Sequence, residues 1–97
     1  MYTNGETYKG DFEDGIRTGR GIYKYANGDQ YSGEWIGNFK HGFGTMTYKG
    51  KGEYRGYWEN GKRHGEGMFH YPNGDVYSGW WRFGEKGGAG TYKFKAA

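Results

Sequence analysis

Residues 54–67 read Tyr-Arg-Gly-Tyr-Trp-Glu-Asn-Gly-Lys-Arg-His-Gly-Glu-Gly, and this stretch decides the fold of the chain. It opens with a tyrosine and a glycine two positions apart, and the same pair recurs along the sequence. The pairs are Tyr8 with Gly10, Tyr31 with Gly33, Tyr54 with Gly56, and Tyr77 with Gly79. Successive tyrosines are 23 residues apart each time. A fixed internal period of this kind is the signature of a repeat architecture.

Other positions of the repeat keep the same period when each tyrosine is counted as position 0. Position 4 is always aromatic: Phe12, Trp35, Trp58 and Trp81. Positions 11 and 13 are always glycine: Gly19, Gly21, Gly42, Gly44, Gly65, Gly67, Gly88 and Gly90. Position 17 is Tyr25, Tyr48, Tyr71 and Phe94. Position 7 is glycine except at Asn38, and asparagine is the residue that best replaces glycine at positive φ.

The period divides residues 1–97 into a single repeat array. Residues 1–7 form the tail of a preceding repeat, because Tyr2 and Gly5 fit its positions 17 and 20. Three full repeats follow at 8–30, 31–53 and 54–76, and residues 77–97 form a truncated repeat that ends at Ala97. Because the sequence starts and stops inside a repeat, we expect it to be a segment of a longer array.

Alternation within the repeat predicts β-strands. Positions 0, 2 and 4 share one face of an extended segment, as do positions 13, 15 and 17. These positions carry aromatic side chains and glycine, whereas the residues between them are mostly polar. A helix is excluded, because each interior glycine would cost about 1 kcal/mol relative to alanine. The predicted fold is all-β: an elongated, single-layer antiparallel meander of stacked hairpins with about eight strands.

The turn residues support this fold. Asp14-Gly15 and Asn60-Gly61 lie inside hairpins, and Asn4-Gly5, Asn27-Gly28 and Asn73-Gly74 lie between hairpins. All five pairs are signals for type I′ turns. The glycines at positions 2 and 13 have a separate role, since the missing side chain lets a neighbouring aromatic ring lie over the backbone.

Composition agrees with a core of rings laid against glycine backbone. The sequence has 22 glycines, eleven tyrosines, six phenylalanines and four tryptophans, but no leucine. Its lack of cysteine excludes disulfides and thiolate metal sites. No apolar stretch reaches the length of a membrane span, so we expect a soluble, intracellular protein. The net charge of +3 is compatible with an acidic partner, and no nucleic-acid partner is expected.

Residues 54–67 are also similar to the MORN motif (membrane occupation and recognition nexus). The residues that carry the resemblance are Tyr54, Gly56, Trp58, Gly61, Lys62, Arg63, His64, Gly65 and Gly67. The resemblance extends over the whole chain. It implies a single-layer β-sheet that serves as a scaffold or docking surface. Similar arrays occur in radial spoke head proteins of cilia, in junctophilins, in plant phosphatidylinositol-phosphate kinases and beside a histone methyltransferase domain.

No catalytic, metal or cofactor site is predicted. His41 and His64 occupy the same repeat position, so they are copies of one loop residue, separated by about 10 Å or more. The paired glycines at positions 11 and 13 lead into strands rather than into a helix, which excludes the phosphate-binding mechanism of a helix N-terminus. We therefore expect a protein that is not an enzyme.

Basic residues near the hairpin turns form the first candidate surface. They are Arg17, Lys40, His41, Lys62, Arg63, His64 and Lys86. Stacked turns would align these residues along one edge of the sheet, where they could attract an acidic partner or anionic lipid. The simpler interpretation is a charged rim that keeps the protein soluble and blocks edge-to-edge aggregation.

Apolar residues on the polar face form the second candidate surface. Position 3 carries Asp11 and Glu34 in the first two repeats but Tyr57 and Trp80 in the next two. Position 14 adds Ile22 and Met68. Other apolar residues in or near the turns are Ile36, Phe39, Phe43 and Phe83. Exposed aromatic patches often mark protein interfaces, whereas the alternative is local cross-strand packing of Tyr57 with Trp80.

These observations predict a non-catalytic scaffold that binds other proteins, including another MORN-repeat chain, within a larger assembly. Our preferred setting is cytoplasmic and cytoskeletal, in the axoneme of a cilium or flagellum, since the resemblance includes radial spoke heads and the whole sequence is repeat. The alternatives are a membrane-contact or phosphoinositide-binding module and the targeting domain of a larger enzyme.

Overall fold

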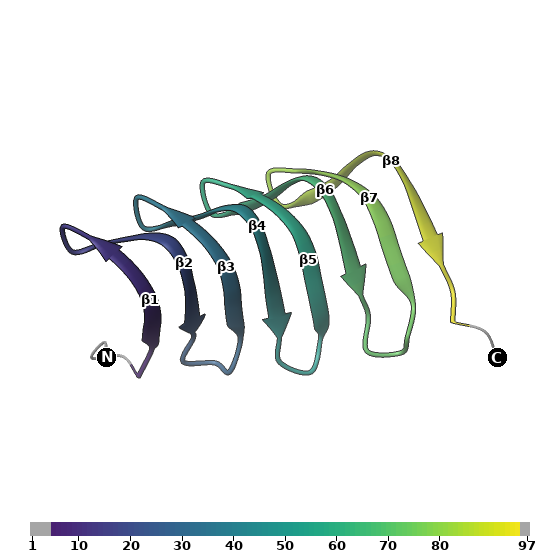
Figure 1. The fold of residues 1–97 in the computed structure, drawn as a ribbon. Coiled ribbons are helices and arrows are strands. Elements are labelled where there is room, and N and C mark those ends of the chain that lie inside the picture. Colours follow the sequence, from purple (N-terminus) through teal and green to yellow (C-terminus); the bar gives the residue numbers. More distant parts are fainter. Residues whose placement is uncertain (1–4, 96–97) are drawn as a thin grey trace.

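The structure is a computed structural model that describes residues 5–95. It is one antiparallel sheet of eight strands in chain order, and it contains no helix within those residues. The strands are β1 (Thr7–Glu13), β2 (Ile16–Lys24), β3 (Gln30–Ile36), β4 (Phe39–Tyr48), β5 (Gly52–Glu59), β6 (Lys62–His70), β7 (Val76–Arg82) and β8 (Glu85–Lys93). Figure 1 shows the curved strands side by side from β1 to β8, and the molecule measures 47 × 25 × 16 Å. The predicted elongated, all-β meander is confirmed. Predictions at Tyr2, Asn4 and Ala97 fall outside the described residues.

A continuous row of paired glycines crosses all eight strands. The row runs through Gly10, Gly21, Gly33, Gly44, Gly56, Gly67, Gly79 and Gly90, each opposite the next. An added Cβ on Gly44 would lie only 2.0 Å from the hydroxyl oxygen of Tyr31 and 2.4 Å from its ring atom Cζ. The predicted packing of tyrosine rings over glycine backbone is therefore confirmed, and no larger residue fits this row.

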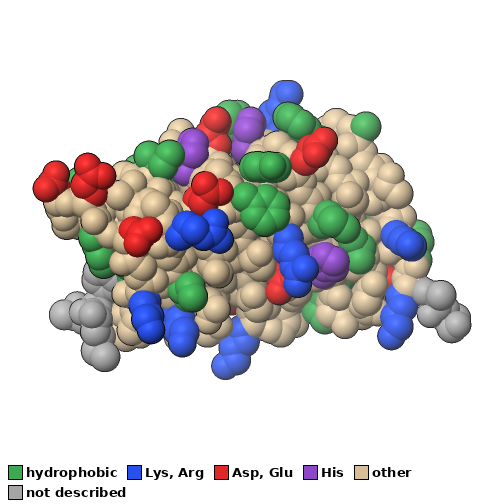
Figure 2. Space-filling view, viewed as in Figure 1, with side chains coloured by type: hydrophobic (Ala, Val, Ile, Leu, Met, Phe, Trp, Pro, Cys, Tyr) green, Lys and Arg blue, Asp and Glu red, His purple; other side chains and the backbone are tan. Residues whose placement is uncertain are grey.

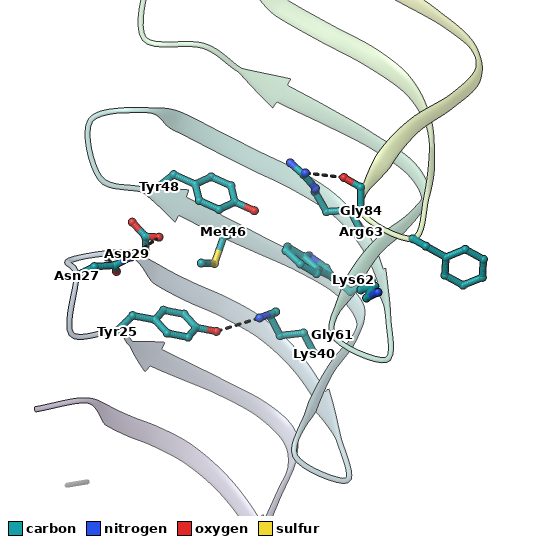
Figure 3. Close-up of a pocket in the computed structure, with 12 residues that line it drawn as sticks. Tyr25, Asn27, Asp29, Lys40, Met46, Tyr48, Gly61, Lys62, Arg63 and Gly84 are labelled. Carbon is teal, nitrogen blue, oxygen red and sulfur yellow. Dashed lines mark hydrogen bonds between the residues drawn. The ribbon is translucent and has the colours of Figure 1, made fainter. Parts of the chain in front are cut away.

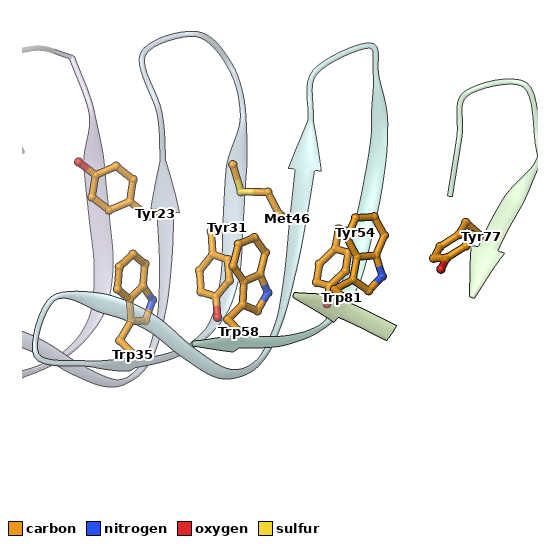
Figure 4. Packing of buried hydrophobic residues seen from close by; sticks show 8 residues of the cluster. All are labelled: Tyr23, Tyr31, Trp35, Met46, Tyr54, Trp58, Tyr77 and Trp81. Atoms are coloured by element: carbon orange, nitrogen blue, oxygen red, sulfur yellow. The ribbon is translucent and has the colours of Figure 1, made fainter. Parts of the chain in front are cut away.

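The core is a single layer of rings on one side of the sheet, which we call the aromatic face. Its buried members are Tyr23, Tyr31, Trp35, Met46, Tyr54, Trp58, Tyr77 and Trp81. Tyr31 lies between two tryptophans, with ring centroids 5.1 Å from Trp35 and 5.4 Å from Trp58, and both contacts are edge-to-face. Figure 4 shows that the three tryptophans occupy equivalent places in successive hairpins, as the period predicted.

Each hairpin closes with two residues at positive φ. The values are 52° and 77° for Asp14 and Gly15, and 49° and 83° for Asn60 and Gly61. Type I′ turns require this combination, so the prediction for both pairs is confirmed. Asn38 has φ of 73°, which confirms that it replaces a glycine.

The turns between hairpins differ from the prediction. At 27–28 and 73–74 only the glycine has positive φ, so these turns are not type I′. The Gly28 N–H donates to the Tyr25 carbonyl, and the Tyr25 N–H donates to the Asp29 carbonyl. A type I turn followed by a left-handed glycine has this pattern. The Asn27 side-chain oxygen accepts from the Asp29 N–H at 2.9 Å, so asparagine serves here through its side chain rather than through positive φ.

Two sets of hydrogen bonds between successive hairpins point toward the earlier repeat. The indole N–H groups of Trp35, Trp58 and Trp81 donate to the carbonyls of Gly21, Gly44 and Gly67, at 3.2, 3.1 and 3.3 Å. The turn N–H groups of Asn38, Gly61 and Gly84 donate to the carbonyls of Arg17, Lys40 and Arg63. Each hairpin tip therefore curls over the hairpin before it, and the aromatic face lies within that curl.

Candidate partner-binding surfaces

The face opposite the rings, here called the outer face, carries an apolar cluster over β4 to β7. Tyr57 occupies an irregularity in the pairing of β5 with β6, between Gly56 and Trp58. A bulge of this kind turns its side chain away from the regular ladder. The Tyr57 ring packs edge-to-face on Phe43, with centroids 5.5 Å apart. The side chains remain 49% and 46% exposed, respectively.

These residues belong to a groove with a volume of about 540 Å³. We call it the outer groove; it is lined by Phe43, Arg55, Tyr57, Glu66, Met68, Trp80 and Ala89, with Gly56, Gly67 and Gly79 among its lining residues. Trp80 and Met68 are 44% and 41% exposed. Figure 2 shows hydrophobic side chains over the middle and later strands of one face, and acidic side chains both among them and toward the first strands.

The structure excludes direct cross-strand packing of Tyr57 with Trp80. Tyr57 lies opposite Phe43 of β4, whereas Trp80 lies opposite Glu66 of β6. Strand β6 therefore separates the two rings, which flank the groove. In the earlier repeats position 3 has a different role, since Glu34 accepts a hydrogen bond from the Phe43 N–H at 2.9 Å.

The other three apolar candidates lie at hairpin ends and do not line the outer groove. Ile36 pairs with Phe39 at the end of β3 and β4, and the two side chains are 57% and 54% exposed. Phe83 is in the last hairpin turn, where its φ is 48° and its ring centroid lies 4.8 Å from that of His64. The predicted apolar set therefore divides into one groove and separate turn residues.

The structure corrects the position of four basic candidates. Arg17, Lys40, Arg63 and Lys86 lie across the aromatic face rather than along an exposed edge. The Arg63 guanidinium carbon is 4.4 Å from the Trp81 ring centroid, and the Lys40 ammonium is 5.3 Å from that of Trp58. Pairing explains the face, because each cation in the last three hairpins lies opposite the tryptophan of its own hairpin. From there Lys40 and Arg63 reach the tryptophan of the next hairpin.

The remaining basic candidates stay near the turns. Lys62 is exposed and pairs with Glu59 at the end of its hairpin. His41 and His64 are half-buried, and His64 Nδ1 accepts a 3.4 Å hydrogen bond from the Phe83 N–H. The predicted continuous basic edge is therefore reduced to single residues. Whether any of the seven binds a ligand remains a prediction.

A second cavity, about 410 Å³ in volume, lies on the aromatic face. We call it the aromatic-face trough; its lining includes Tyr25, Asp29, Lys40, Met46, Tyr48, Trp58, Lys62, Arg63 and Gly84. Lys40 donates to the Tyr25 hydroxyl at 3.0 Å, and Arg63 donates to the Gly84 carbonyl at 2.6 Å (Figure 3). Burial, followed by the nearby charge of Arg17, lowers the pKa of Lys40. Burial raises the pKa of Tyr25 to about 12.

The repeats described above match a known family. The MORN-repeat family model matches residues 8–30, 31–53 and 54–76. The chain belongs to the MORN-repeat family. A comparison with curated proteins found no match. MORN repeats are generally modules for interaction with proteins or membranes.

The carboxylates that join successive turns of this MORN array were not among the residues predicted from sequence. Asp29 and Asp75 occupy the same repeat position, and each accepts a 2.8 Å hydrogen bond from a backbone N–H of the following repeat, at Lys49 and Lys95. The Lys95 N–H is the main cause of the lowered pKa of Asp75. A signal was present, because Glu6 occupies the same position and also bonds to the following repeat.

Two further findings concern metal-binding groups and membrane-spanning helices among the described residues. Residues 5–95 contain no group of three histidine, cysteine or acidic side chains arranged to hold a metal ion. In the same part of the MORN array, no helix is long and apolar enough to cross a bilayer.

Proposed function

We propose that this MORN array is a non-catalytic scaffold that binds a protein partner through the outer groove. The observation that carries the proposal is the half-exposed set of Phe43, Tyr57, Met68 and Trp80 around one groove. Aromatic and methionine side chains are typical of interface cores. Covering them releases about 25 cal/mol for each Å² of apolar surface removed from water.

The outer groove can receive an apolar anchor side chain. The backbone of Gly56, Gly67 and Gly79 is part of its lining, and Tyr57 and Trp80 flank it. Arg55 and Glu66 add charges of opposite sign to the lining. A partner segment with one large apolar residue beside polar groups fits this arrangement, and a second MORN-repeat chain is among the partners that could supply it.

The proposed setting is a cytoskeletal assembly, with the radial spoke head of a ciliary or flagellar axoneme as the first choice. Resemblance to MORN arrays of that assembly supports this choice. A membrane-contact role is less well supported, because Arg17, Lys40 and Arg63 are half-buried on the aromatic face. Lipid attraction needs basic residues near the membrane surface, and Lys62 and Lys86 are the exposed residues among the seven basic candidates.

The test compares the double variant Tyr57→Ala/Trp80→Ala with wild type and with Ile22→Ala. Ile22 lies on the outer face, is 39% exposed and is outside the groove. Proteins captured from the native cell by both wild type and Ile22→Ala should fall at least tenfold with the double variant, while the circular dichroism spectrum stays β-rich. Equal capture by all three proteins contradicts the proposal, as does loss of β-structure in the double variant.

Two further measurements separate the settings. A tagged chain should fractionate with axonemes and resist detergent extraction if the assembly is axonemal. Flotation with anionic vesicles at low salt tests the membrane alternative. Vesicle binding that persists in the double variant, together with no axonemal retention, would favour the membrane role.

A further inference from the structure

The aromatic face carries a regularly spaced row of cations that the outer-groove function does not use. Lys40, Arg63 and Lys86 are 23 residues apart, each is the second residue of β4, β6 or β8, and each lies over aromatic rings. Within residues 5–95 the only ion pair within 4.0 Å joins Arg55 to Glu53. No described carboxylate therefore neutralises these three charges, and the hydrogen bonds that their side chains donate go to neutral hydroxyl and carbonyl oxygens.

The one carboxylate in the trough is already occupied. Asp29 accepts hydrogen bonds from the Lys49 N–H at 2.8 Å and from the Asn27 side chain at 3.2 Å. Figure 3 shows Asp29 beside Asn27 at one side of the trough and the side chains of Lys40 and Arg63 at the other. The cation row therefore forms a strip of positive charge along one side, where an anionic group meets no competing carboxylate.

Aromatic residues follow the same spacing beside the cations. Tyr25, Tyr48 and Tyr71 share position 17, are half-buried, and lie next to the row. The hydroxyl groups of Tyr25 and Tyr71 accept hydrogen bonds from Lys40 and Lys86, at 3.0 and 2.8 Å. Tyrosine rings and positive charges therefore alternate along the aromatic face. Aromatic-lined grooves are the surfaces on which polyproline II segments dock.

The repeat spacing selects the conformation of the occupant. Each hairpin contributes two strands about 4.8 Å apart, so cations recur about every 9.6 Å across the sheet. A polyproline II helix has three residues per turn and a rise of about 3.1 Å, so every third side chain returns to one face after about 9.3 Å. In a β-strand every second side chain returns to one face, after about 6.6 Å. In an α-helix side chains return to one face after one turn of about 5.4 Å, or after two turns at about 10.8 Å. The polyproline II spacing is the nearest to the cation spacing.

We infer that the aromatic face, along the aromatic-face trough and on to Lys86 and Tyr71 beyond it, binds an acidic, proline-rich protein segment in the polyproline II conformation, with a carboxylate at every third residue. The carboxylates pair with Lys40, Arg63 and Lys86, and the intervening proline rings lie on Tyr25, Tyr48 and Tyr71. This site lies on the face opposite the outer groove, so one sheet could hold two partners at once. The inference does not depend on the outer groove.

The test measures binding of labelled synthetic peptides to the full 97-residue chain by fluorescence anisotropy. The probe is a peptide of four Glu-Pro-Pro units. One control replaces each glutamate with glutamine, and a second control has the same composition with all its glutamates adjacent. The first peptide should bind at least tenfold more tightly than either control, and its affinity should fall as salt rises. Equal binding of the clustered peptide would overturn the proposed spacing.

A matched pair of variants locates the site. Lys40→Met/Arg63→Met removes two charges from the row, and Lys24→Met/Lys93→Met removes two exposed charges from elsewhere. The first variant should lose at least fivefold in affinity, whereas the second should bind within twofold of wild type. The Tyr57→Ala/Trp80→Ala variant should also bind like wild type, which separates failure here from failure at the outer groove. Equal losses in both charge variants would overturn the inference.

A measurement on the wild-type chain guards against a variant that fails to fold. The indole N–H resonances of Trp58 and Trp81 report on the aromatic face, and that of Trp80 reports on the outer face. Adding the Glu-Pro-Pro peptide should shift the first two signals and leave the third unchanged. A shift confined to Trp80, or binding to anionic vesicles through Lys40 and Arg63 without any peptide binding, would refute the proposed occupant.

Discussion

The indole nitrogen of Trp58 donates a 3.1 Å hydrogen bond to the carbonyl oxygen of Gly44, one hairpin earlier in the chain. Trp58 is 5% exposed, so the bond is shielded from water and joins two repeats through one side chain. Trp35 and Trp81 repeat the same bond at their own positions. Cohesion of the array therefore depends on contacts between hairpins as well as within them.

The variant Trp58→Phe should lower the free energy of unfolding by about 2 kcal/mol, because it removes a buried hydrogen bond and part of a buried ring. Urea denaturation followed by circular dichroism measures the change. Trp80→Phe is the matched control on the outer face and should change stability by no more than about 0.5 kcal/mol. Similar losses of stability for the two substitutions would show that the inter-repeat hydrogen bond does not stabilise the array.

The variant Gly44→Ala should cost about 3 kcal/mol or more, because its new methyl group would overlap the Tyr31 ring at the centre of the glycine row. Gly87→Ala is the control, since Gly87 lies on exposed β8 and its nearest contact would be Arg82 Cβ at 3.3 Å. Thermal and urea unfolding measure both variants. A cost below about 1 kcal/mol for Gly44→Ala would mean that the ring moves aside easily.

Alkaline pH should destabilise the array. Burial raises the pKa of Tyr25 and Tyr54 to about 12 in the folded chain, whereas an unfolded tyrosine ionises near about 10. Between these values the folded chain holds more protons than the unfolded chain, so stability is intact below pH of about 10 and falls as pH rises toward 12. Urea unfolding across this range should show the decline, and Tyr54→Phe should make it shallower. A flat profile would contradict the shift.

The variant Phe83→Asn should raise the free energy of unfolding by about 1 kcal/mol, because phenylalanine at φ of 48° is strained in the left-handed region. The same turn position carries Asp14, Gly37 and Asn60 in the other hairpins. The reciprocal variant Asn60→Phe should lose a similar amount. Urea denaturation tests both, and a loss of stability in Phe83→Asn would show that the ring contact with His64 outweighs the backbone strain.

Much of the fold could be predicted from sequence because the same pattern of residues recurs in every repeat. Alternating positions predicted the aromatic face, and Asp14-Gly15 and Asn60-Gly61 predicted the hairpin turns. The outer groove was predictable in part, since Tyr57 and Trp80 break a column that begins with Asp11 and Glu34. Their separation by β6 required the strand register, which sequence spacing alone does not give.

The cation row was predictable in principle but was placed on the wrong surface. Arg17, Lys40, Arg63 and Lys86 share position 9, which has the same parity as the aromatic positions 15 and 17 of the strand. That parity indicated the aromatic face, but proximity to the turn favoured an edge. The type I′ prediction at Asn27 and Asn73 was wrong because asparagine occurs in turns for two separate reasons. It can adopt positive φ, or its side chain can accept a hydrogen bond, as it does here.

The backward direction of the inter-hairpin bonds has a consequence for synthesis on the ribosome. Each new hairpin brings the donors, such as the Trp58 indole and the Gly61 N–H, while the matching carbonyls of Gly44 and Lys40 have already emerged. Each new hairpin can therefore bond to the hairpin before it as soon as it leaves the ribosome, because the acceptor carbonyls are already in place. Growth of the ribbon can thus follow translation, and a few side chains, such as Arg63, find their acceptor only when the next hairpin arrives.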